Sequence, residues 1–346
     1  MKGTDSMKNG IIVAGSTIAD YLKKIDIYPG ESNLTAIRKV DIALGGLVCN
    51  CGQDLARLDP ELRVTAVGIV GDDDAGKLIC EVLGKYPNID VSGIIRRGQT
   101  SFTDVMYDSE RKTRTFFHFN GADAEMTPED FDFDAIKGDI LHIGYALLLD
   151  SLDAPHPVYG TNLAAVLHSA QEKGIKTSMD IVSEESDRYR TIVVPALKYV
   201  DYCIVNETEA SRTTGIPAAD ENGRIIESNM PLICRELRRL GVKDRIIIHA
   251  KPASYGLDTD GTYYRMDCID VPKSMIVSTT GAGDAFCSGA LYGIYRGMSM
   301  RDTMYFATGV ASCSLTAANA SDGVVSYEKT LGFMKKYPVP DCIVVR

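Results

Sequence analysis

The stretch VSTTGAGDAFCSGALYGIYRG (residues 277–297) places two glycines and a carboxylate at the start of an apolar helix. Asp284 suits this position, because an acidic side chain in the first turn offsets the unpaired amides of a helix N-terminus. Gly281 and Gly283 need another explanation, since glycine costs about 0.5–1 kcal/mol in ordering where an ordinary residue would serve. We therefore expect the amides of Gly281, Ala282 and Gly283 to be exposed, so that a phosphate-like anion can approach the helix.

Outward from this stretch, short apolar runs alternate with segments of helical periodicity. The runs predicted as strands are GIIVAGS (10–16), VTAVGIVG (64–71), ILHIG (140–144), KTSMDI (176–181), YCIVN (202–206) and RIIIHA (245–250). Helices are predicted near 75–85, 159–173 and 188–198, and after each of the last two runs. This alternation is typical of an α/β fold with a doubly wound, mainly parallel sheet flanked by helices, which binds ligands at the carboxyl ends of its strands.

Two segments, roughly 20–43 and 95–119, break the alternation with strand-like patterns that lack helices. In the second, DSERK (108–112) is typical of a hairpin turn. We predict that both segments form a small β-sheet lid over the active site, within a single domain spanning 1–346. The alternative is an edge hairpin with no role in the site.

The composition restricts the class of protein. The chain of 346 residues has a net charge of −10 and no block of Lys or Arg, which argues against a nucleic-acid-binding surface. No long apolar run indicates a membrane span, and the first ten residues lack the apolar core of a signal peptide. Nine scattered cysteines without a CxxC pair indicate reduced thiols, so we expect a cytoplasmic protein.

Two motifs partly match nucleotide-binding loops. GDDDAGKL (71–78) matches most of a phosphate-binding P-loop, but Leu78 replaces the Ser or Thr that holds magnesium, and three Asp residues lie where phosphates would bind. We interpret it as a strand end, a turn and a helix with an acidic first turn. The opening strand has only one glycine of the dinucleotide-binding pattern, which argues against a hydride-transfer enzyme.

A further glycine-containing motif, LGGLVCNCGQDLARLD (44–59), precedes a helical pattern. Gly45 and Gly46 allow the backbone to approach a ligand closely, and Asn50 offers both a donor and an acceptor to a hydroxyl group. Taken alone, the two glycines are equally well explained by a tight turn.

A polar motif, VNETEA (205–210), ends a predicted strand. The spacing of three residues between Asn206 and Glu209 places both side chains at the mouth of one helix. Taken alone, Asn206 is equally well explained as a helix cap.

Together, GGLVCNCGQDLARL, NETE and STTGAGDAFCSG occur in an order that resembles the ribokinase-like carbohydrate kinase (PfkB) family. The resemblance extends over nearly the whole chain, from GSTIAD (15–20) to TAANASDGVVS (316–326). It implies an α/β domain with a β-lid over the sugar. It also implies transfer of the γ-phosphoryl group of ATP, with Mg²⁺, to a hydroxyl group of a sugar, sugar acid or nucleoside.

The resemblance implies a role for each motif. Asp284 is the base that takes the proton of the acceptor hydroxyl, while the amides of residues 281–283 form an anion hole for the moving phosphoryl group. The residues that fall where the family binds sugar hydroxyls are Asp20, Gly45, Gly46 and Asn50. The residues assigned to magnesium and phosphate, acting through water, are Asn206, Glu209 and Asp180. Thr308 falls near the adenine side of the nucleotide site. Lys251 stands where the family favours glycine, and we expect it to add a charge for a phosphate instead.

Several positions depart from the family pattern. Ribose-phosphorylating members usually carry Asn and Lys where this chain has Ile18 and Leu47, so a buried sugar hydroxyl would lose its partner and ribose is disfavoured. These apolar side chains could face a base, which makes a nucleoside kinase an alternative. Ser278 replaces a common Asp in a loop that helps hold a monovalent cation, so potassium activation stays open.

Two further expectations concern the nucleotide and the assembly. HAKPASYG (249–256) replaces the usual Gly-x-x-Gly nucleotide segment, so a non-catalytic sugar- or nucleotide-binding protein is a further alternative. The small sheet would present edges and apolar surface that a partner can cover, so we expect a homodimer through the lid.

Overall fold

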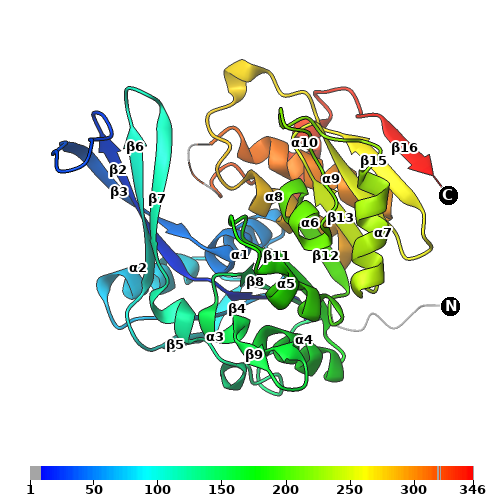
Figure 1. The fold of residues 1–346 in the computed structure, drawn as a ribbon, viewed down its shortest axis with the longest axis horizontal. Helices are drawn as coiled ribbons and strands as arrows, with labels where there is room; N and C mark the ends of the chain where they lie inside the picture. Colours follow the sequence, from blue (N-terminus) through cyan, green and yellow to red (C-terminus); the bar gives the residue numbers. More distant parts are fainter. Residues whose placement is uncertain (1–8, 318, 320, 346) are drawn as a thin grey trace.

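The protein is described from a computed structural model that covers residues 9–317, 319 and 321–345. Its main element is a ten-stranded sheet (Figure 1). In sheet order the strands are β16 (Cys342–Val345), β15 (Tyr263–Asp267), β14 (Ala253–Leu257), β13 (Arg245–His249), β12 (Tyr202–Asn206), β11 (Lys176–Ile181), β8 (Ile140–Ala146), β1 (Ile11–Gly15), β4 (Val64–Val70) and β5 (Ile89–Arg96). From β13 to β5 every neighbouring pair is parallel, which confirms the predicted mainly parallel sheet.

The alternation of side chains along the central strands builds a core on each face of the sheet. In β1, Ile11 and Val13 join the core on one face, whereas Ile12 and Ala14 join the core on the other. The first core is covered by α1 (Leu47–Leu58), α2 (Asp74–Leu83), α8 (Ala282–Tyr295), α9 (Met300–Ser314) and α10 (Tyr327–Met334). The second is covered by α3 (Asp150–Asp153), α4 (Asn162–Glu172), α5 (Tyr189–Leu197), α6 (Glu207–Thr214) and α7 (Met230–Leu240).

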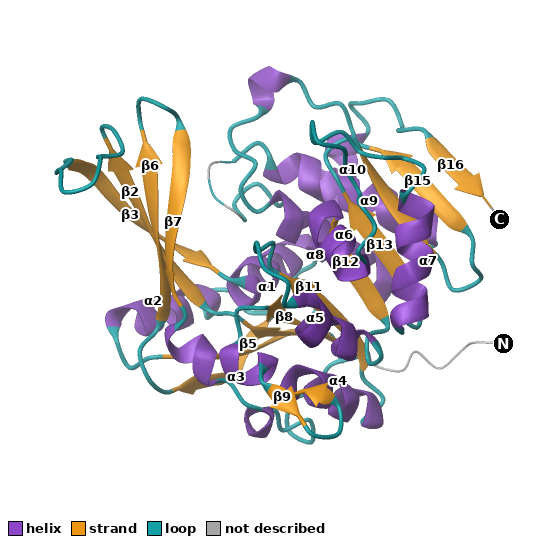
Figure 2. Cartoon of the chain, viewed as in Figure 1, coloured by secondary structure: helices purple, strands orange, loops and turns teal. Residues whose placement is uncertain are grey.

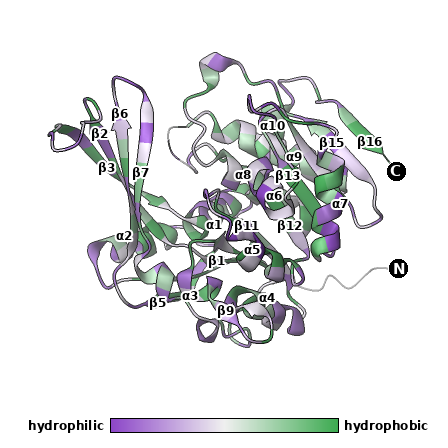
Figure 3. Cartoon of the chain, viewed as in Figure 1, coloured by the Kyte–Doolittle hydropathy of each residue, from purple (hydrophilic) through white to green (hydrophobic). Residues whose placement is uncertain are grey.

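The hydropathy of the chain follows these layers. Figure 3 shows hydrophobic colouring along central strands such as β13 and mixed colouring on the covering helix α7. Within the described ranges, no helix combines the length and the apolar character that crossing a membrane requires.

The prediction of a helix directly after the run 245–250 is wrong. β13 instead turns back into β14 and β15, which pair antiparallel to it, and the next α-helix is α8. Only three residues separate β13 from β14, enough for an antiparallel return, whereas a parallel crossover needs a dozen or more.

A four-stranded sheet stands apart from the main sheet (Figure 2). Its strand order is β3 (Ile37–Gly45), β2 (Ile18–Ile25), β6 (Ser101–Asp108) and β7 (Thr113–Phe119). β2 and β6 are parallel and the other pairs are antiparallel. The small sheet is thus built from the two segments expected, and the β6–β7 turn lies within the predicted DSERK hairpin. We call this element the accessory sheet.

The remaining elements are short. They are β9 (Pro155–His156) and β10 (Gly160–Thr161), which pair with each other, and the 3₁₀ helices η1 (Gly121–Glu125), η2 (Pro128–Asp130) and η3 (Lys273–Met275).

At the motif GDDDAGKL (71–78), the Asp73 carboxylate caps α2 by accepting from the Gly76 amide at 2.8 Å. An acidic side chain thus takes the place that a phosphate would need.

Candidate active site

The glycines of the motif 277–297 lie at the N-terminus of α8. Gly281 is the N-cap residue with φ 78°, a left-handed conformation that favours glycine. The amide of Ala282 already donates to the Thr279 carbonyl at 3.3 Å. Among the described residues, the amides of Gly281 and Gly283 have no backbone acceptor. Of the three amides expected to bind an anion, those of Gly281 and Gly283 are therefore available for binding.

Asp284, in the first turn of α8, is half-buried and held by two side chains from other elements. Its Oδ2 accepts from Asn50 Nδ2 of α1 at 3.0 Å, and its Oδ1 accepts from the Tyr145 hydroxyl of β8 at 2.6 Å. Burial raises the pKa of Asp284, and these two hydrogen bonds oppose the increase. The carboxylate is thus fixed in orientation at the carboxyl end of a central strand.

Tyr145 was not identified from the sequence. It belongs to no glycine-containing or acidic motif, but it directly follows the predicted strand 140–144. A polar side chain at the carboxyl end of a central strand is the signal that could have found it.

Gly45 makes room for the Asp20 carboxylate. The two lie on paired strands of the accessory sheet, and a Cβ atom on Gly45 would approach Asp20 Oδ2 to 2.4 Å. Burial raises the pKa of Asp20 to about 6, a hydrogen bond from Thr103 opposes the increase, and the charge of Asp284 adds to it. Asp20 therefore lies within electrostatic reach of Asp284.

Gly46 and Asn50 complete this side of the site. Gly46 has φ 79°, and a Cβ atom there would lie 2.5 Å from the Ser16 carbonyl oxygen. Asn50 is 7% exposed, and its Oδ1 atom is buried with no hydrogen-bond donor among the described residues. A buried acceptor without a donor is costly unless a ligand or water supplies one. Asn50 is therefore suited to accept from a hydroxyl group.

Asn206 and Glu209 form a capping box at the start of α6. Asn206 Oδ1 accepts from the Glu209 amide at 2.9 Å, and Glu209 Oε2 accepts from the Asn206 amide at 2.9 Å. The Ser183 hydroxyl, which no sequence motif indicated, donates to Glu209 Oε1 at 2.8 Å and accepts from Asn206 Nδ2 at 2.9 Å. The explanation of Asn206 as a helix cap therefore agrees with the hydrogen bonds at the start of α6. Because the same contacts occupy the carboxylate, any contact of Glu209 with a cation is best made through water.

Asp180 and Glu209 add negative charge next to Asp284. Burial raises the pKa of Glu209 to about 7. Burial and the charges of Glu209 and Asp284 hold the pKa of Asp180 well above its usual range. Oxygen donors of this kind fit Mg²⁺, which prefers carboxylates and water. A divalent cation would also relieve the mutual repulsion of these carboxylates.

Two other expected site residues were assigned to the nucleotide. Lys251 is exposed in the turn between β13 and β14. Thr308 is 3% exposed in α9, where its hydroxyl donates to the Met304 carbonyl at 2.9 Å. The proton of the Thr308 hydroxyl is therefore already used within its own helix.

The apolar residues that suggested a nucleoside kinase belong to the core. Ile18 is 6% exposed and Leu47 is fully buried. Leu47 belongs to the core cluster on the face of the sheet that also contains residues of α8 and α9. Both side chains are buried in this structure, but Ile18 lies on the same face of the accessory sheet as Asp20, so the nucleoside alternative stays open.

A polar pair joins the accessory sheet to the glycine loop. The Arg114 guanidinium of β7 donates to the Thr280 hydroxyl, directly before Gly281. Register places Arg114 on the same face of this sheet as Thr103 and Asp20. The face that carries Asp20 is therefore also the face that reaches the N-terminus of α8.

Replacing Asp20 by Asn should stabilise the fold. Because the native pKa of Asp20, about 6, exceeds the usual value of 3.8, the folded state binds this proton more tightly than the unfolded state. This contribution to stability is full below pH 3.8 and is lost as pH rises through about 6. Asn carries no such cost, so we expect a gain of about 1–3 kcal/mol at neutral pH.

Denaturant unfolding of both proteins at several pH values measures this gain. It should shrink as the pH is lowered through about 6. A gain that does not depend on pH would contradict the assignment to Asp20 ionisation.

The profile of the pfkB family carbohydrate kinases matches residues 8–326. The chain is 24% identical to a ribokinase of Arabidopsis thaliana over 334 residues, covering 94% of this chain and 81% of the ribokinase. It is 27% identical to a 5-dehydro-2-deoxygluconokinase of Clostridium perfringens over 327 residues, covering 90% of each. The structure of Arabidopsis ribokinase with ribose and ATP superposes with a TM-score of 0.74 at 21% identity, covering 95% of this chain and 99% of that one.

Proposed function

The chain belongs to the pfkB family of carbohydrate kinases, and from this premise we propose that it transfers the γ-phosphoryl group of ATP to a hydroxyl group of a sugar or sugar acid. The single observation that carries the proposal is the position of Asp284. Its carboxylate is fixed by Asn50 and Tyr145, directly beside the unpaired amides at the N-terminus of α8.

In the proposed reaction Asp284 accepts the proton of the acceptor hydroxyl as that oxygen attacks the phosphoryl group. The amides of Gly281 and Gly283 donate to the phosphoryl oxygens and stabilise the developing charge, a contribution of roughly 3–4 kcal/mol per donor. When bound with ATP, Mg²⁺ would offset phosphate charge, and Asp180, Asn206 and Glu209 would hold it through water.

The sugar would be held on the opposite side of Asp284. Asp20 and Asn50 Oδ1 are the acceptors proposed for its hydroxyl groups, and Gly45 and Gly46 keep the backbone close to it. The accessory sheet, which carries Asp20, is the proposed lid. The contact between Arg114 and Thr280 supports this role because it joins the accessory sheet to the glycine loop.

The proposal is tested by measuring ADP release with Mg²⁺ and ATP over a panel of aldohexoses, ketohexoses, pentoses, sugar acids and nucleosides. We expect release with at least one sugar or sugar acid and not with nucleosides. Repeating the productive reaction with and without K⁺ tests whether the loop containing Ser278 supports activation by a monovalent cation. Binding of sugars without any ADP release would favour the non-catalytic alternative.

The apolar face of the accessory sheet supports a homodimer. Four large apolar side chains on this face are 42–53% exposed: Val40, Ile42, Phe117 and Phe119. Strand register places them with Tyr21 and Phe102, and with the ion pair of Lys23 and Asp104, on the face opposite Asp20. Clustered exposed apolar residues of this kind mark interaction surfaces. We propose that this face packs against the same face of a second copy.

Replacing Phe117 by Asp should convert the dimer to a monomer, because a charge in an apolar interface must be desolvated. The matched control is Phe116→Asp, the same change at the neighbouring residue, whose side chain is 62% exposed on the opposite face. Sedimentation at micromolar concentration measures the mass. A monomeric wild type, or equal dissociation of both variants, would contradict the proposed interface.

A further inference from the structure

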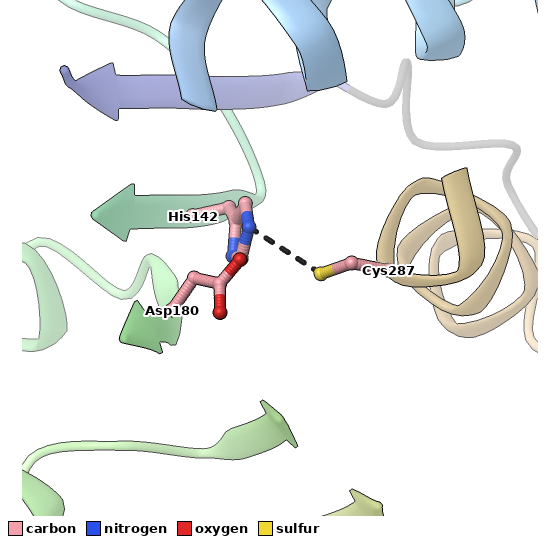
Figure 4. Close-up of side chains that lie close together, drawn as sticks. All are labelled: His142, Asp180 and Cys287. Carbon is pink, nitrogen blue, oxygen red and sulfur yellow. Dashed lines mark hydrogen bonds between the residues drawn. The ribbon is translucent and has the colours of Figure 1, made fainter. Parts of the chain in front are cut away.

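Three potential metal ligands converge in the core beside the candidate active site. His142 of β8, Asp180 of β11 and Cys287 of α8 each place one ligand atom within 4.8 Å of the other two. His142 and Cys287 are 0% and 1% exposed, and Asp180 is half-buried. Figure 4 shows His142 and Asp180 on neighbouring strands, with Cys287 facing them from the helix.

The imidazole of His142 is oriented as a ligand would be. Its Nδ1 lies 3.0 Å from the Ser178 hydroxyl, on the paired residue of β11. With the Nδ1 proton donated to Ser178, the lone pair of Nε2 points toward Cys287 Sγ, 3.4 Å away. A hydrogen bond to the second ring nitrogen is the usual means by which a metal-binding histidine is fixed.

The spacing fits a tetrahedral ion. Zinc ligands at about 2.0–2.3 Å from the metal lie roughly 3.3–3.8 Å from one another. The distance between His142 Nε2 and Cys287 Sγ already falls in this range. All three ligand atoms lie within 4.8 Å of one another, so only a small movement of the half-buried Asp180 carboxylate is needed. Asp180 Oδ1 accepts from the Ile181 amide at 2.8 Å, which leaves its other oxygen to turn toward the ion.

We propose that His142 Nε2, Cys287 Sγ and the Asp180 carboxylate form a binding site for a thiophilic divalent transition-metal ion such as Zn²⁺. Thiolate and imidazole select such ions, whereas Mg²⁺ prefers oxygen. Three protein ligands leave the fourth position open to water. On binding, the Cys287 thiol loses its proton to solvent and the sulfur–metal bond forms, with no change of oxidation state. Because Asp180 is also one of the residues proposed to hold Mg²⁺, the transition-metal ion would compete with Mg²⁺ for its carboxylate.

Titration of the full chain with Co²⁺, a spectroscopic substitute for Zn²⁺, tests the proposal without measuring kinase activity. We expect a thiolate-to-cobalt charge-transfer band that saturates at one ion per chain. Zn²⁺ should displace the band, and excess Mg²⁺ should leave it unchanged. Absence of the band in folded wild-type protein would overturn the proposal.

Two variants locate the ion. Cys287→Ser should lose the band, whereas the control Cys234→Ser, which removes an equally buried thiol of α7, should keep it. An equal band in Cys287→Ser would assign the ion to another cysteine and overturn the site. Should Cys287→Ser fail to fold, Ser178→Ala keeps all three ligands but loses the orienting hydrogen bond. We expect about 10–100-fold weaker Co²⁺ affinity from it, and unchanged affinity would contradict the proposed site.

Discussion

Replacing Asp284 by Asn should lower kcat by about 10²–10⁴-fold, the usual contribution of a general base. The change preserves the shape of the side chain and removes its ability to accept a proton. Steady-state kinetics with the best acceptor from the sugar panel measure the effect. The matched control is Asp74→Asn, which neutralises an exposed acidic residue in the first turn of α2.

This comparison separates catalysis from helix stabilisation. If Asp284 only offset the amides of its helix, both variants would show the same small change in thermal stability and similar turnover. A loss of less than about tenfold in the Asp284 variant, with the fold intact, would contradict the role of a base.

If Asp284 is the base, kcat should fall as the pH is lowered. Because burial raises the pKa of Asp284, its active, ionised form is lost at a higher pH than for an ordinary Asp. The acidic limb of the kcat profile should therefore lie above the usual range of Asp.

The proximity of Asn50 and Asp284 could be predicted from the sequence, although 234 residues separate them. Both belong to glycine-containing motifs in a parallel α/β fold, and ligands of such folds collect at the carboxyl ends of the strands. Glycine motifs stand out in a single sequence, because glycine loses more conformational entropy on folding than other residues and is retained only where the backbone needs it.

Other contacts were not predictable from local patterns. Tyr145 and Ser183 reach the site from strand ends. Many polar residues share such a position, so it does not single out these two in the sequence. The turn of β13 into β14 depends on the length of a connection, which hydrophobic periodicity does not encode. Leu47 lies next to the motif glycines and yet enters the core, because the first turn of α1 brings that side chain close to Gly144 of β8.

The accumulation of acidic groups explains why sugar binding should be sensitive to geometry. Asp20 and Asp284 are close enough that the charge of one raises the pKa of the other. Holding both carboxylates near one substrate has an electrostatic cost, which binding and reaction must offset. Small shifts of the Asp20 carboxylate should therefore disturb binding of the acceptor and its alignment with Asp284.

Gly45→Ala should produce such a shift and lower kcat/KM by about 10²-fold, since misplacing a bound group by about 1 Å can cost this much. The added Cβ would lie 2.4 Å from Asp20 Oδ2 and 2.7 Å from its Cγ, so the carboxylate must move. A matched control is Gly332→Ala in α10, where an added Cβ meets no atom of the described residues within 4 Å. Kinetics of both variants with the same acceptor provide the measurement.

The direction of this effect distinguishes the proposed role of Asp20 from a structural one. Displacing a sugar-binding carboxylate should raise KM for the acceptor while leaving KM for ATP nearly unchanged, because the contacts proposed for the phosphates are made by Gly281 and Gly283 and not by Asp20. Adding Asp20→Asn to Gly45→Ala should cost little more than the first change, since both act on the same contact. Full additivity of the two losses would show that Gly45 acts on the site by a route other than Asp20.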